Sequence, residues 1–457
     1  MKRRTFLKVS GLSMAATLGN GGTKTAEAPA STKAGFVHEP ARDIPIAGEA
    51  DVIVCGAGPA GVSAAIAAAR KGARTLLLEA HGCLGGIWTS GLLSWILDHQ
   101  NKKGFMQELL QKLAEREGRT FTKKGTGTNG YDTEVMKSLL EDLCAEAGVQ
   151  IQLHTCVCAA LRNADKRLNA IITESKSGRE AFKGKLFIDC TGDGDLATQA
   201  GCGFDFGHPE TGRAQPMSLM ALVTGIVPDE IQAFYRDIDG APWAQPKDML
   251  RGEMERGGHS PSYGKPTLFR IRDDLFALMT NHEYEVKGTD ARDVTRATLH
   301  ARKEINQLLS GLRSVGGAWK NIRLVATAEQ IGVREGRRIR GLYTVSADDI
   351  RDGREHKDAV CRVTFGIDVH ATDPKQEKGV EKAAFRSKPY DIPLRALIAR
   401  DVQGLLMAGR CISGDFLAHS SYRVTGNAVA MGEAAGKVAA VAAQTNRLPQ
   451  SVALSEC

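Results

Sequence analysis

The sequence predicts an α/β fold in which a parallel sheet with helices carries a small antiparallel ribbon and an inserted α+β domain. Two observations support this prediction. Short apolar, β-branched segments alternate with helix-like segments, as expected of strands buried on both faces of a parallel sheet. Residues 207–320 lose this alternation. The chain has 457 residues, of which 42% are hydrophobic and 25% charged, which is ordinary for a globular protein of more than one domain.

The first strand, residues 51–55, leads directly into a glycine-rich turn and an alanine-rich helix. The turn reads Gly56-Ala57-Gly58-Pro59-Ala60-Gly61. Gly56 permits the tight turn, Gly58 lets backbone approach a pyrophosphate, and Gly61 lets the helix pack close to the strand. The partial positive charge at the start of the helix would face the phosphates. This pattern is typical of a Rossmann-like dinucleotide-binding fold.

An acidic residue closes the second strand, residues 74–78. Glu79 falls 23 residues after Gly56, near the ~20 expected of the acid that accepts the ribose hydroxyls. A lone glycine fingerprint is weak, and a glycine-rich turn without a nucleotide is the alternative. The strand before the turn, the helix after it and the acid at this distance together favour a nucleotide.

A glycine pair, Gly85-Gly86, follows six residues after Glu79 and bears on which dinucleotide is bound. A pair at this place resembles the FAD-binding flavoproteins, in which the loop passes beside the pyrophosphate and the flavin. NAD enzymes usually lack it. The resemblance implies FAD, with NAD as the alternative. His81 and Cys83 lie close enough in the sequence to ask whether FAD is covalently attached.

Residues 1–30 are predicted to be a signal peptide and not part of the fold. The segment Lys2-Arg3-Arg4-Thr5-Phe6-Leu7-Lys8 resembles the twin-arginine export signal. The apolar run that follows is too short and too polar for a stable membrane span. We therefore expect the twin-arginine machinery to export the folded, FAD-loaded protein to the periplasm or beyond. The alternative is an ordinary basic N-terminus.

Charge and cysteine usage exclude several classes of partner. The formal net charge is +7, and nothing in its distribution argues for nucleic acid. None of the ten cysteines forms a CxxC pair, so a zinc or iron–sulfur site is a poor interpretation. We expect no metal and no disulfide framework.

The first domain is predicted to continue with a helix, a strand and a ribbon. The helix begins at Asp132 or Thr133 and has leucines at helical spacing. A strand at residues 151–158, which contains Val157, follows it, and residues 161–186 form the antiparallel ribbon. The next buried strand ends in Thr191-Gly192. In two-dinucleotide flavoproteins, a strand with this ending lies beside the cofactor.

A polar helix pattern runs from Asp290 to Leu312, in the stretch that lacks the strand and helix alternation. These patterns divide the chain into four parts. The parts are the signal at 1–30, the N-terminal part of the FAD-binding domain at 31–207, an inserted substrate domain at 208–330, and the C-terminal part of the FAD-binding domain at 331–457.

Two further motifs lie in the C-terminal part. Residues 331–341 are rich in arginine and include Arg334. They form either a solvated face or a site in which arginine holds a carboxylate or phosphate bidentately. Residues 405–415 contain Gly409-Arg410, and a small-residue helix follows Arg423. The N-terminus of that helix, if it points at the flavin, would stabilise the negative charge that reduction builds there.

The order of these motifs resembles the FAD-dependent oxidoreductase family, whose members carry GxGxxG, a GvREsRRI-like stretch and an nLLvAGRciS-like stretch. The resemblance covers about residues 50–445 and implies a two-dinucleotide FAD fold. Many flavoproteins have an aspartate where this chain has Arg410, and Asp415 is the candidate substitute. The cofactor-binding residues that follow are Gly56, Gly58, Pro59, Ala60, Gly61, Glu79, Ala80, Gly85, Gly86, Val157, Thr191, Gly192, Gly409, Arg410, Asp415 and Asn427.

The expected activity is a dehydrogenase reaction in which hydride passes from a substrate C–H to flavin N5 while a base takes a proton. His419 is the first candidate base, since histidine titrates near neutral pH, although a core or capping histidine is the alternative. His99 and Asp98 are second choices. Arg423 and Arg334 are expected to anchor an anionic or hydroxyl-rich substrate.

Export suggests a small external metabolite, such as a sugar or a hydroxy acid, as the substrate. The electron acceptor is not identified by the sequence. A second enzyme class is the reduction or desaturation of a carbon–carbon bond beside a carboxylate. A third interpretation is a flavin electron carrier without a substrate, which predicts no sizeable cleft.

Overall fold

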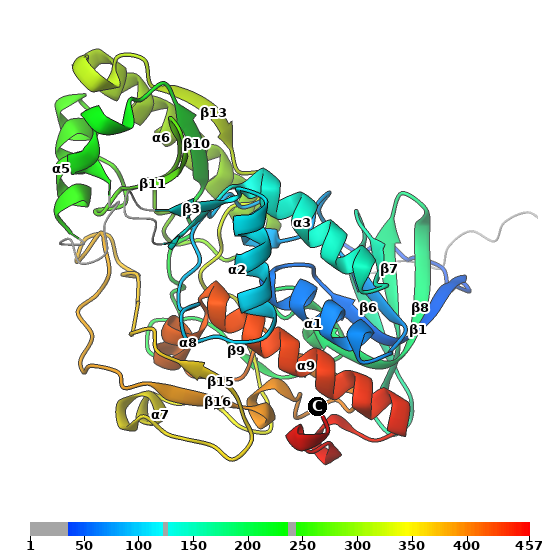
Figure 1. Cartoon of the computed structure of the whole chain (residues 1–457). Coiled ribbons are helices and arrows are strands. Elements are labelled where there is room, and N and C mark those ends of the chain that lie inside the picture. The colour runs from blue at the N-terminus through cyan, green and yellow to red at the C-terminus, as the bar shows by residue number, and fades with distance from the viewer. Residues whose placement is uncertain (1–34, 122–126, 236–243) are drawn as a thin grey trace, which may run out of the picture. The chain divides into compact units, whose positions relative to one another are not determined.

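The computed structural model describes residues 35–121, 127–235 and 244–457. Within these ranges, residues 44–457 form one compact unit (Figure 1). The predicted twin-arginine signal at 1–30 lies outside the described residues.

A seven-stranded sheet forms the centre of this unit. The last residues of β1, from Val52 to Cys55, are fully buried, because the strand is covered on both faces. This sheet confirms the predicted α/β class. Its parallel strands, in spatial order, are β5 (Gln150–Gln152), β2 (Thr75–Leu78), β1 (Ile46–Cys55), β8 (Gly178–Asp189) and β17 (Leu405–Met407).

The long strand β8 joins the parallel sheet to an antiparallel ribbon. Its C-terminal residues pair with β17, while its N-terminal residues pair with β7 (Leu168–Ser175). Strand β7 pairs in turn with β6 (Cys156–Arg162). The ribbon expected at 161–186 is therefore present, and it begins a few residues earlier than predicted. The expected strand at 151–158 is divided between β5, which ends at Gln152, and β6, which begins at Cys156.

The helices α1, α3 and α9 pack against the sheet, while α2 packs against α3 and α9. Asp132 caps α3, since its carboxylate accepts hydrogen bonds from the N–H groups of Glu134 and Val135, as the sequence predicts. Figure 1 shows α1 and α9 lying side by side along the sheet. The helices are α1 (Pro59–Arg70), α2 (Phe105–Glu115), α3 (Thr133–Glu146) and α9 (Thr425–Thr445).

Helices α1 and α9 approach each other closely through glycine. A Cβ atom added at Gly432 would lie 2.1 Å from the carbonyl oxygen of Ala60, and one at Gly436 would lie 2.1 Å from that of Ala64. Both clashes are with backbone, which cannot rotate away. The hydroxyl of Ser63 also donates to the carbonyl of Val429 at 2.8 Å. This contact sets the positions of both helix N-termini.

Gly436→Ala is expected to lower the free energy of unfolding by about 3 kcal/mol, because overpacking against backbone lies at the upper end of the usual 1–3 kcal/mol. Guanidinium denaturation followed by circular dichroism measures it. The matched control is Gly252→Ala in α5 (Gln245–Arg256), where the added Cβ meets nothing within 4 Å and a small gain of up to about 1 kcal/mol is expected. Equal stability of the two variants would contradict the packing argument.

A second sheet with its own hydrophobic cluster follows in the chain. Asp290 caps α6, close to the start of the helix predicted from 290 to 312. The sheet runs in the order β11 (Thr267–Arg272), β12 (Leu275–Met279), β10 (Met220–Thr224) and β13 (Arg323–Thr327), and it packs with α5 (Gln245–Arg256) and α6 (Ala291–Val315). The domain boundaries at 207/208 and 330/331 stay predictions.

The other α-helices and β-strands of the described residues lie outside these two sheets. Their bounds are β3 (Arg119–Phe121), β4 (Gly127–Tyr131), α4 (Asp195–Gln199), β9 (Phe204–Asp205), β14 (Arg338–Ile339), α7 (Ala347–Asp352), β15 (Ala359–Val363), β16 (Tyr390–Pro393) and α8 (Phe416–Tyr422).

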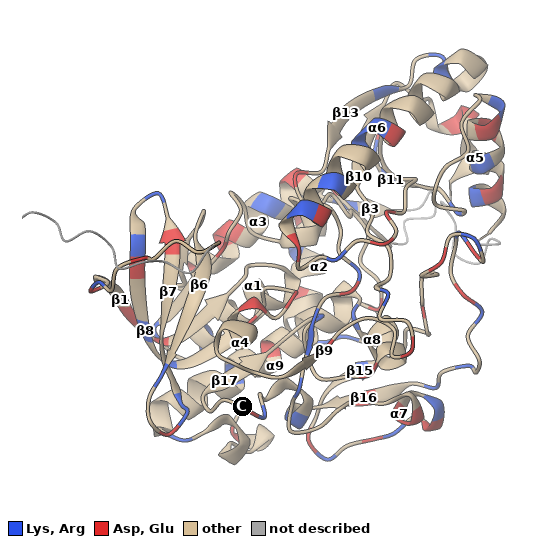
Figure 2. Cartoon of the chain, turned by 180° about the vertical axis from the view of Figure 1, so that it is seen from behind, with Lys and Arg blue, Asp and Glu red and all other residues tan. Residues whose placement is uncertain are grey.

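Charged residues of both signs are interspersed along the helices of the second sheet, as Figure 2 shows for α5 and α6. The ten cysteines are free thiols. In the part of the chain that the structure describes, no helix has the length and apolarity needed to cross a membrane.

Candidate active site

A cavity of about 990 Å³ lies at the carboxyl ends of the parallel strands. Open α/β sheets bind their ligands at this edge. The residues that follow β1, β2, β8 and β17 all contribute to its wall, and Met220, Phe269 and Met279 of the second sheet contribute as well. The cavity is therefore shared between the dinucleotide-binding sheet and the second sheet.

The glycine-rich turn forms one wall of the cavity. Gly56 has φ +92°, and a Cβ there would lie 2.4 Å from the carbonyl oxygen of Cys190. A Cβ at Gly61 would lie 1.8 Å from the carbonyl oxygen of Gly56. The fold itself requires these two glycines. Gly58 differs, because it lines the cavity and a Cβ there would meet no atom within 4 Å.

Glu79 holds this turn in place. It is 5% exposed, and its Oε2 accepts a hydrogen bond from the Ala57 N–H at 2.6 Å while Oε1 accepts one from the His81 N–H at 2.9 Å. A carboxylate oxygen has more than one acceptor position, so Glu79 can still accept from ribose hydroxyls at the cavity wall that it lines.

An ion pair stands where many flavoproteins carry an aspartate. Arg410 Nη2 donates to Asp193 Oδ1 at 2.8 Å, and both residues line the cavity. Asp189 holds the adjoining loop by accepting from the N–H and hydroxyl of Thr191 at 3.0 and 2.7 Å. Burial raises the pKa of Asp189 to about 6, although these hydrogen bonds oppose the shift. The carboxylate at this part of the cavity thus comes from the loop after β8.

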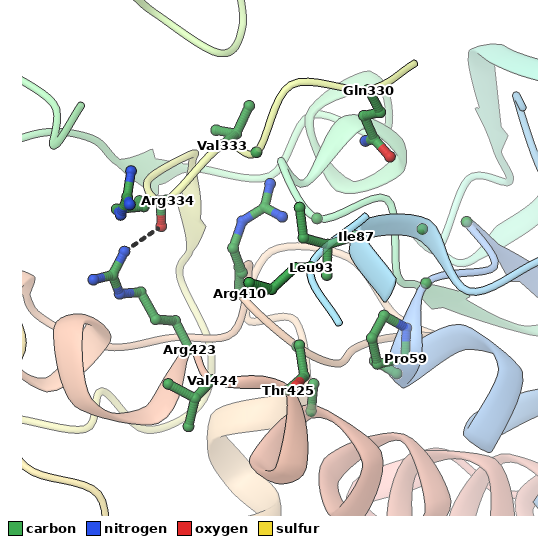
Figure 3. A pocket seen from close by; sticks show the side chains of 18 of the residues that line it. Pro59, Ile87, Leu93, Gln330, Val333, Arg334, Arg410, Arg423, Val424 and Thr425 are labelled. Carbon is green, nitrogen blue, oxygen red and sulfur yellow. Dashed lines mark hydrogen bonds between the residues drawn. The ribbon is translucent and has the colours of Figure 1, made fainter. Parts of the chain in front are cut away.

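The N-terminus of α9 reaches the cavity from a third side. Val424, Thr425 and Ala428 line the wall, and Figure 3 shows Thr425 near the start of α9 and Pro59 at the start of α1. The first N–H groups of a helix lack intrahelical acceptors and carry partial positive charge. Two helix N-termini therefore face one cavity, as a cofactor with phosphates and a reducible ring requires.

Most of the predicted cofactor residues meet at this cavity. Those that line it are Gly56, Gly58, Pro59, Ala60, Glu79, Ala80, Gly86, Val157, Thr191, Gly192, Gly409 and Arg410. Gly61, Gly85, Asp415 and Asn427 do not line it. Gly85 supports the turn instead, since its N–H donates to the Ala57 carbonyl at 2.7 Å. Asn427 is fully buried, and within the described ranges its Nδ2 has no hydrogen-bond partner.

The proposed roles of His419 and Asp415 need correction. His419 is fully buried, does not line the cavity, and packs edge-on against Tyr422. Burial and the charges of nearby arginines, Arg338 first, hold the pKa of His419 well below its usual value. Asp415 caps α8, and its two carboxylate oxygens accept from the N–H groups of Ala418 and Ala347. Neither residue therefore lies at the cavity wall.

Two arginines and one carboxylate gather at the far end of the cavity. Arg423 Nη2 donates to Asp368 Oδ2 at 3.2 Å, and its Nη1 donates to the Arg334 carbonyl at 3.4 Å. Arg334 Nη1 donates to the Pro216 carbonyl and to the Ser218 hydroxyl, each at 2.8 Å. Figure 3 shows both arginine side chains on the same side of the cavity.

The arginine pair leaves a surplus of positive charge at this end of the cavity. Burial and the charge of Arg423 lower the pKa of Arg334 to about 10, so it stays charged at neutral pH. Burial alone would raise the pKa of Asp368, but His370 and the two arginines more than offset it and leave the pKa below its usual value. Two cations and one anion therefore face the cavity.

His370 completes this cluster and also lines the cavity. Its Nε2 lies 3.3 Å from Asp368 Oδ2. Burial, followed by the charge of Arg334, lowers the pKa of His370 to about 3, so the imidazole is neutral at neutral pH. Tyr263 lines the wall nearby, and burial raises the pKa of its hydroxyl to about 12, which keeps it protonated.

Sequence patterns did not point to Tyr263, Asp368 or His370. These residues belong to no glycine-rich or arginine-rich motif, and Tyr263 lies 107 positions from His370. The second choices for the base, Asp98 and His99, are buried and do not line the cavity. Asp98 pairs with Lys102 instead. Of the residues considered for covalent attachment, His81 lines the cavity and Cys83 does not.

The fold and this cavity define a dinucleotide-binding α/β protein. The chain belongs to the FAD dependent oxidoreductase family, whose model matches residues 51–457. It is therefore an oxidoreductase with FAD as its cofactor, and the residues of the glycine-rich turn, Glu79 and the two helix N-termini fit that cofactor.

Solved structures similar to this chain were also found. A geranylgeranyl bacteriochlorophyll reductase-like protein from Thermoplasma acidophilum is 12% identical, with 87% of this chain and 79% of that one covered and a TM-score of 0.43. The flavin-dependent brominase Bmp2 is 13% identical, with 87% and 79% covered and a TM-score of 0.44. The p-nitrophenol 4-monooxygenase PnpA from Pseudomonas putida is 13% identical, with 65% and 70% covered and a TM-score of 0.39. No curated protein matches the chain.

Proposed function

We propose that the protein is a dehydrogenase of a small hydroxy acid. The observation behind this proposal is the pair of arginines, Arg334 and Arg423, at the far end of the cavity, where Arg423 donates to the carboxylate of Asp368. Their surplus positive charge suits an anionic substrate. The planar guanidinium matches a carboxylate through two parallel hydrogen bonds. A neutral sugar would leave this charge uncompensated.

The remaining polar groups suit the hydroxyl of such a substrate. Asp368 is ionised and 26% exposed, so it can accept the hydroxyl proton. His370 lies behind it, and the protonated Tyr263 hydroxyl can donate to the substrate oxygen. The base role expected of His419 thus passes to the Asp368–His370 pair.

FAD, when bound, accepts a hydride at N5. The hydroxy acid loses that hydride from its carbon and a proton from its oxygen, and the product is a keto acid. In this reaction Arg334 and Arg423 bind and orient the carboxylate, and Asp368 removes the proton. The two electrons then leave to an electron acceptor whose identity is open.

We further propose that the protein works in the periplasm or outside the cell. The support is the twin-arginine-like sequence of residues 2–8, with the export machinery as a transient partner. Fusion of residues 1–30 to a reporter that is active only after folded export tests this, and Arg3→Lys with Arg4→Lys should abolish export.

A second candidate is the reduction of a carbon–carbon double bond beside a carboxylate. The same arginines would hold the acid, and the neutral hydroxyl of Tyr263 would be a proton donor in the cavity. An electron carrier without a substrate is disfavoured, because the cavity extends from the glycine-rich turn to the second sheet.

A substrate panel separates these functions. Glycolate, lactate, malate, glucose, fumarate and crotonate are mixed anaerobically with the holoenzyme, and the visible flavin band is followed. We expect one or more hydroxy acids to bleach the oxidised flavin. Bleaching by glucose alone would contradict the proposal, and reoxidation of chemically reduced enzyme by fumarate or crotonate alone would establish the double-bond reductase.

Arg334→Lys is expected to raise KM for the reactive hydroxy acid by about tenfold to a hundredfold, because a charge-assisted hydrogen bond is worth about 1.5–3 kcal/mol and lysine lacks the fork. Steady-state kinetics measures it. The matched control is Arg340→Lys in the same stretch, which has a 44% exposed side chain and pairs with Asp205. An unchanged KM in Arg334→Lys would remove this residue from the substrate site.

A further inference from the structure

One side of the cavity is apolar, and it is built from two parts of the chain. We call its six side chains the apolar wall. None of the predicted cofactor residues belongs to it. The members are Met220, Phe269 and Met279 of the second sheet, and Leu93, Trp95 and Leu97 of the segment 92–98.

The segment 92–98 presents every second residue to the cavity. Leu93, Trp95 and Leu97 are half-buried and line the cavity, whereas the four residues between and beside them are buried and do not. A period of two is that of an extended chain, so the three apolar side chains form one continuous face. That face is turned to the cavity.

The second sheet places its part of the apolar wall on one face. Met220 of β10 and Thr267 of β11 are both direct register partners of Met279 in β12. Phe269 lies two positions further along β11 and therefore on the same face. The rings of Phe269 and Trp95 are 5.2 Å apart, centroid to centroid. The two parts of the apolar wall thus meet at this aromatic pair.

Arg334 lies at the end of the apolar wall. Its Nη2 donates to Met279 Sδ at 3.7 Å. Neighbouring strands lie about 5 Å apart, so the path from Arg334 over Met279 to the aromatic pair is longer than a methyl group. A carboxylate held by Arg334 would therefore bring a short side group only to Met279, and a longer one to the aromatic pair.

We propose that the substrate is a 2-hydroxy acid with a branched or aromatic side group, such as 2-hydroxyisocaproate or phenyllactate, and that the apolar wall selects it. This rests on the function proposed above, in which the substrate carbon loses a hydride to FAD and the hydroxyl loses a proton to Asp368. The side group covers the apolar wall and removes it from water. Malate would instead bury a second carboxylate against apolar side chains, which is unfavourable for an unpaired charge.

Trp95→Ala tests this selection. For the native enzyme, we expect the second-order rate constant of anaerobic flavin reduction to be at least about tenfold higher with phenyllactate than with lactate, since one methylene group in an apolar pocket already gives about that factor. Trp95→Ala should lower this ratio by about tenfold and leave FAD retention unchanged. Because both substrates are measured on one sample, the ratio does not depend on the fraction of folded enzyme.

Phe234→Ala is the matched control. Phe234 is half-buried, adjoins the same hydrophobic cluster as Trp95 and packs edge-on against Trp319 at 5.1 Å, but it does not line the cavity. We expect it to keep the native ratio. Native reduction at least as fast with lactate, or equal ratios in the two variants, would overturn the proposal. Loss of FAD from Trp95→Ala with an unchanged ratio would also overturn it, because the apolar wall would then contact the flavin.

A second measurement needs no turnover. Phenylacetate and acetate are carboxylates without a hydroxyl group, and each is titrated into the oxidised holoenzyme in a calorimeter. We expect the Kd of phenylacetate to be at least about tenfold lower than that of acetate, and equal values would overturn the role of the apolar wall. If phenylacetate binds more tightly but no hydroxy acid reduces the flavin, the proposed reaction fails and the recognition stands. If lactate or malate reduces the flavin fastest, the reaction stands and the selection fails.

Discussion

Gly58→Val is expected to give a folded protein that no longer retains FAD. An added Cβ at Gly58 meets no protein atom within 4 Å, so the fold has room for a side chain there. That room lies at the cavity wall between the two ends of the glycine-rich turn, where the backbone must approach the pyrophosphate. We expect the Kd for FAD to rise at least about a hundredfold, which corresponds to about 2.8 kcal/mol.

Two other glycines supply the contrast for this experiment. Gly252→Val in α5 also enters open space but lies away from the cavity, so it should keep FAD. Gly61→Ala places a Cβ 1.8 Å from the Gly56 carbonyl oxygen and should unfold the turn itself. The flavin absorbance after gel filtration, together with circular dichroism, distinguishes these cases. A Gly58→Val protein that retains flavin as tightly as Gly252→Val would contradict the assignment of Gly58 to the site where the backbone approaches the pyrophosphate.

Asp368→Asn is expected to have the largest effect on catalysis. Asparagine keeps an acceptor oxygen for Arg423 and His370 but cannot take a proton from the substrate. The rate constant of flavin reduction by a hydroxy acid should fall on the order of a hundredfold to ten-thousandfold. Binding of a carboxylate should not weaken, because the variant leaves two arginines without their anion. Stopped-flow absorbance and titration with oxalate measure the two quantities separately.

Asp373→Asn is the matched control for this variant. Its carboxylate pairs with Arg213 at 3.0 Å and has the same 26% side-chain exposure as Asp368, but it does not line the cavity. We expect unchanged reduction and unchanged oxalate binding. Slow reduction accompanied by weak oxalate binding in Asp368→Asn would mean that the substitution had disrupted the arginines, and the base role would then be lost.

Local patterns predicted the local structure of the glycine-rich turn and of the elements beside it. The turn at Gly56, the acid at Glu79 and the cap at Asp132 are each determined by a few neighbouring residues, and the structure has all three. The family match confirms FAD, which the sequence implied through Gly85-Gly86. Gly85 supports the turn through a backbone hydrogen bond, so even a residue that does not line the cavity was a useful signal.

The substrate half of the site could not be predicted in the same way. Tyr263, Asp368 and His370 lie on segments that meet only through the packing of the second sheet against the first. His419 was predicted to be the base, but its side chain is buried. Burial depends on tertiary packing, and the local sequence around a histidine near a glycine turn does not show whether the side chain is buried or exposed. The ion pair of Arg410 could not be predicted because its partner Asp193 lies 217 residues away in the chain.

The close contact of α1 with α9 has a consequence for biosynthesis. The hydrogen bond from Ser63 to Val429 spans 366 residues, and β17 enters the sheet beside β8 from the same late part of the chain. Long-range contacts of this kind form after local ones, and domains fold as the chain emerges from the ribosome. A nascent chain in which α9 has not yet emerged from the ribosome therefore lacks one wall of the FAD cavity. Cofactor loading becomes a late event that marks a chain as fully synthesised.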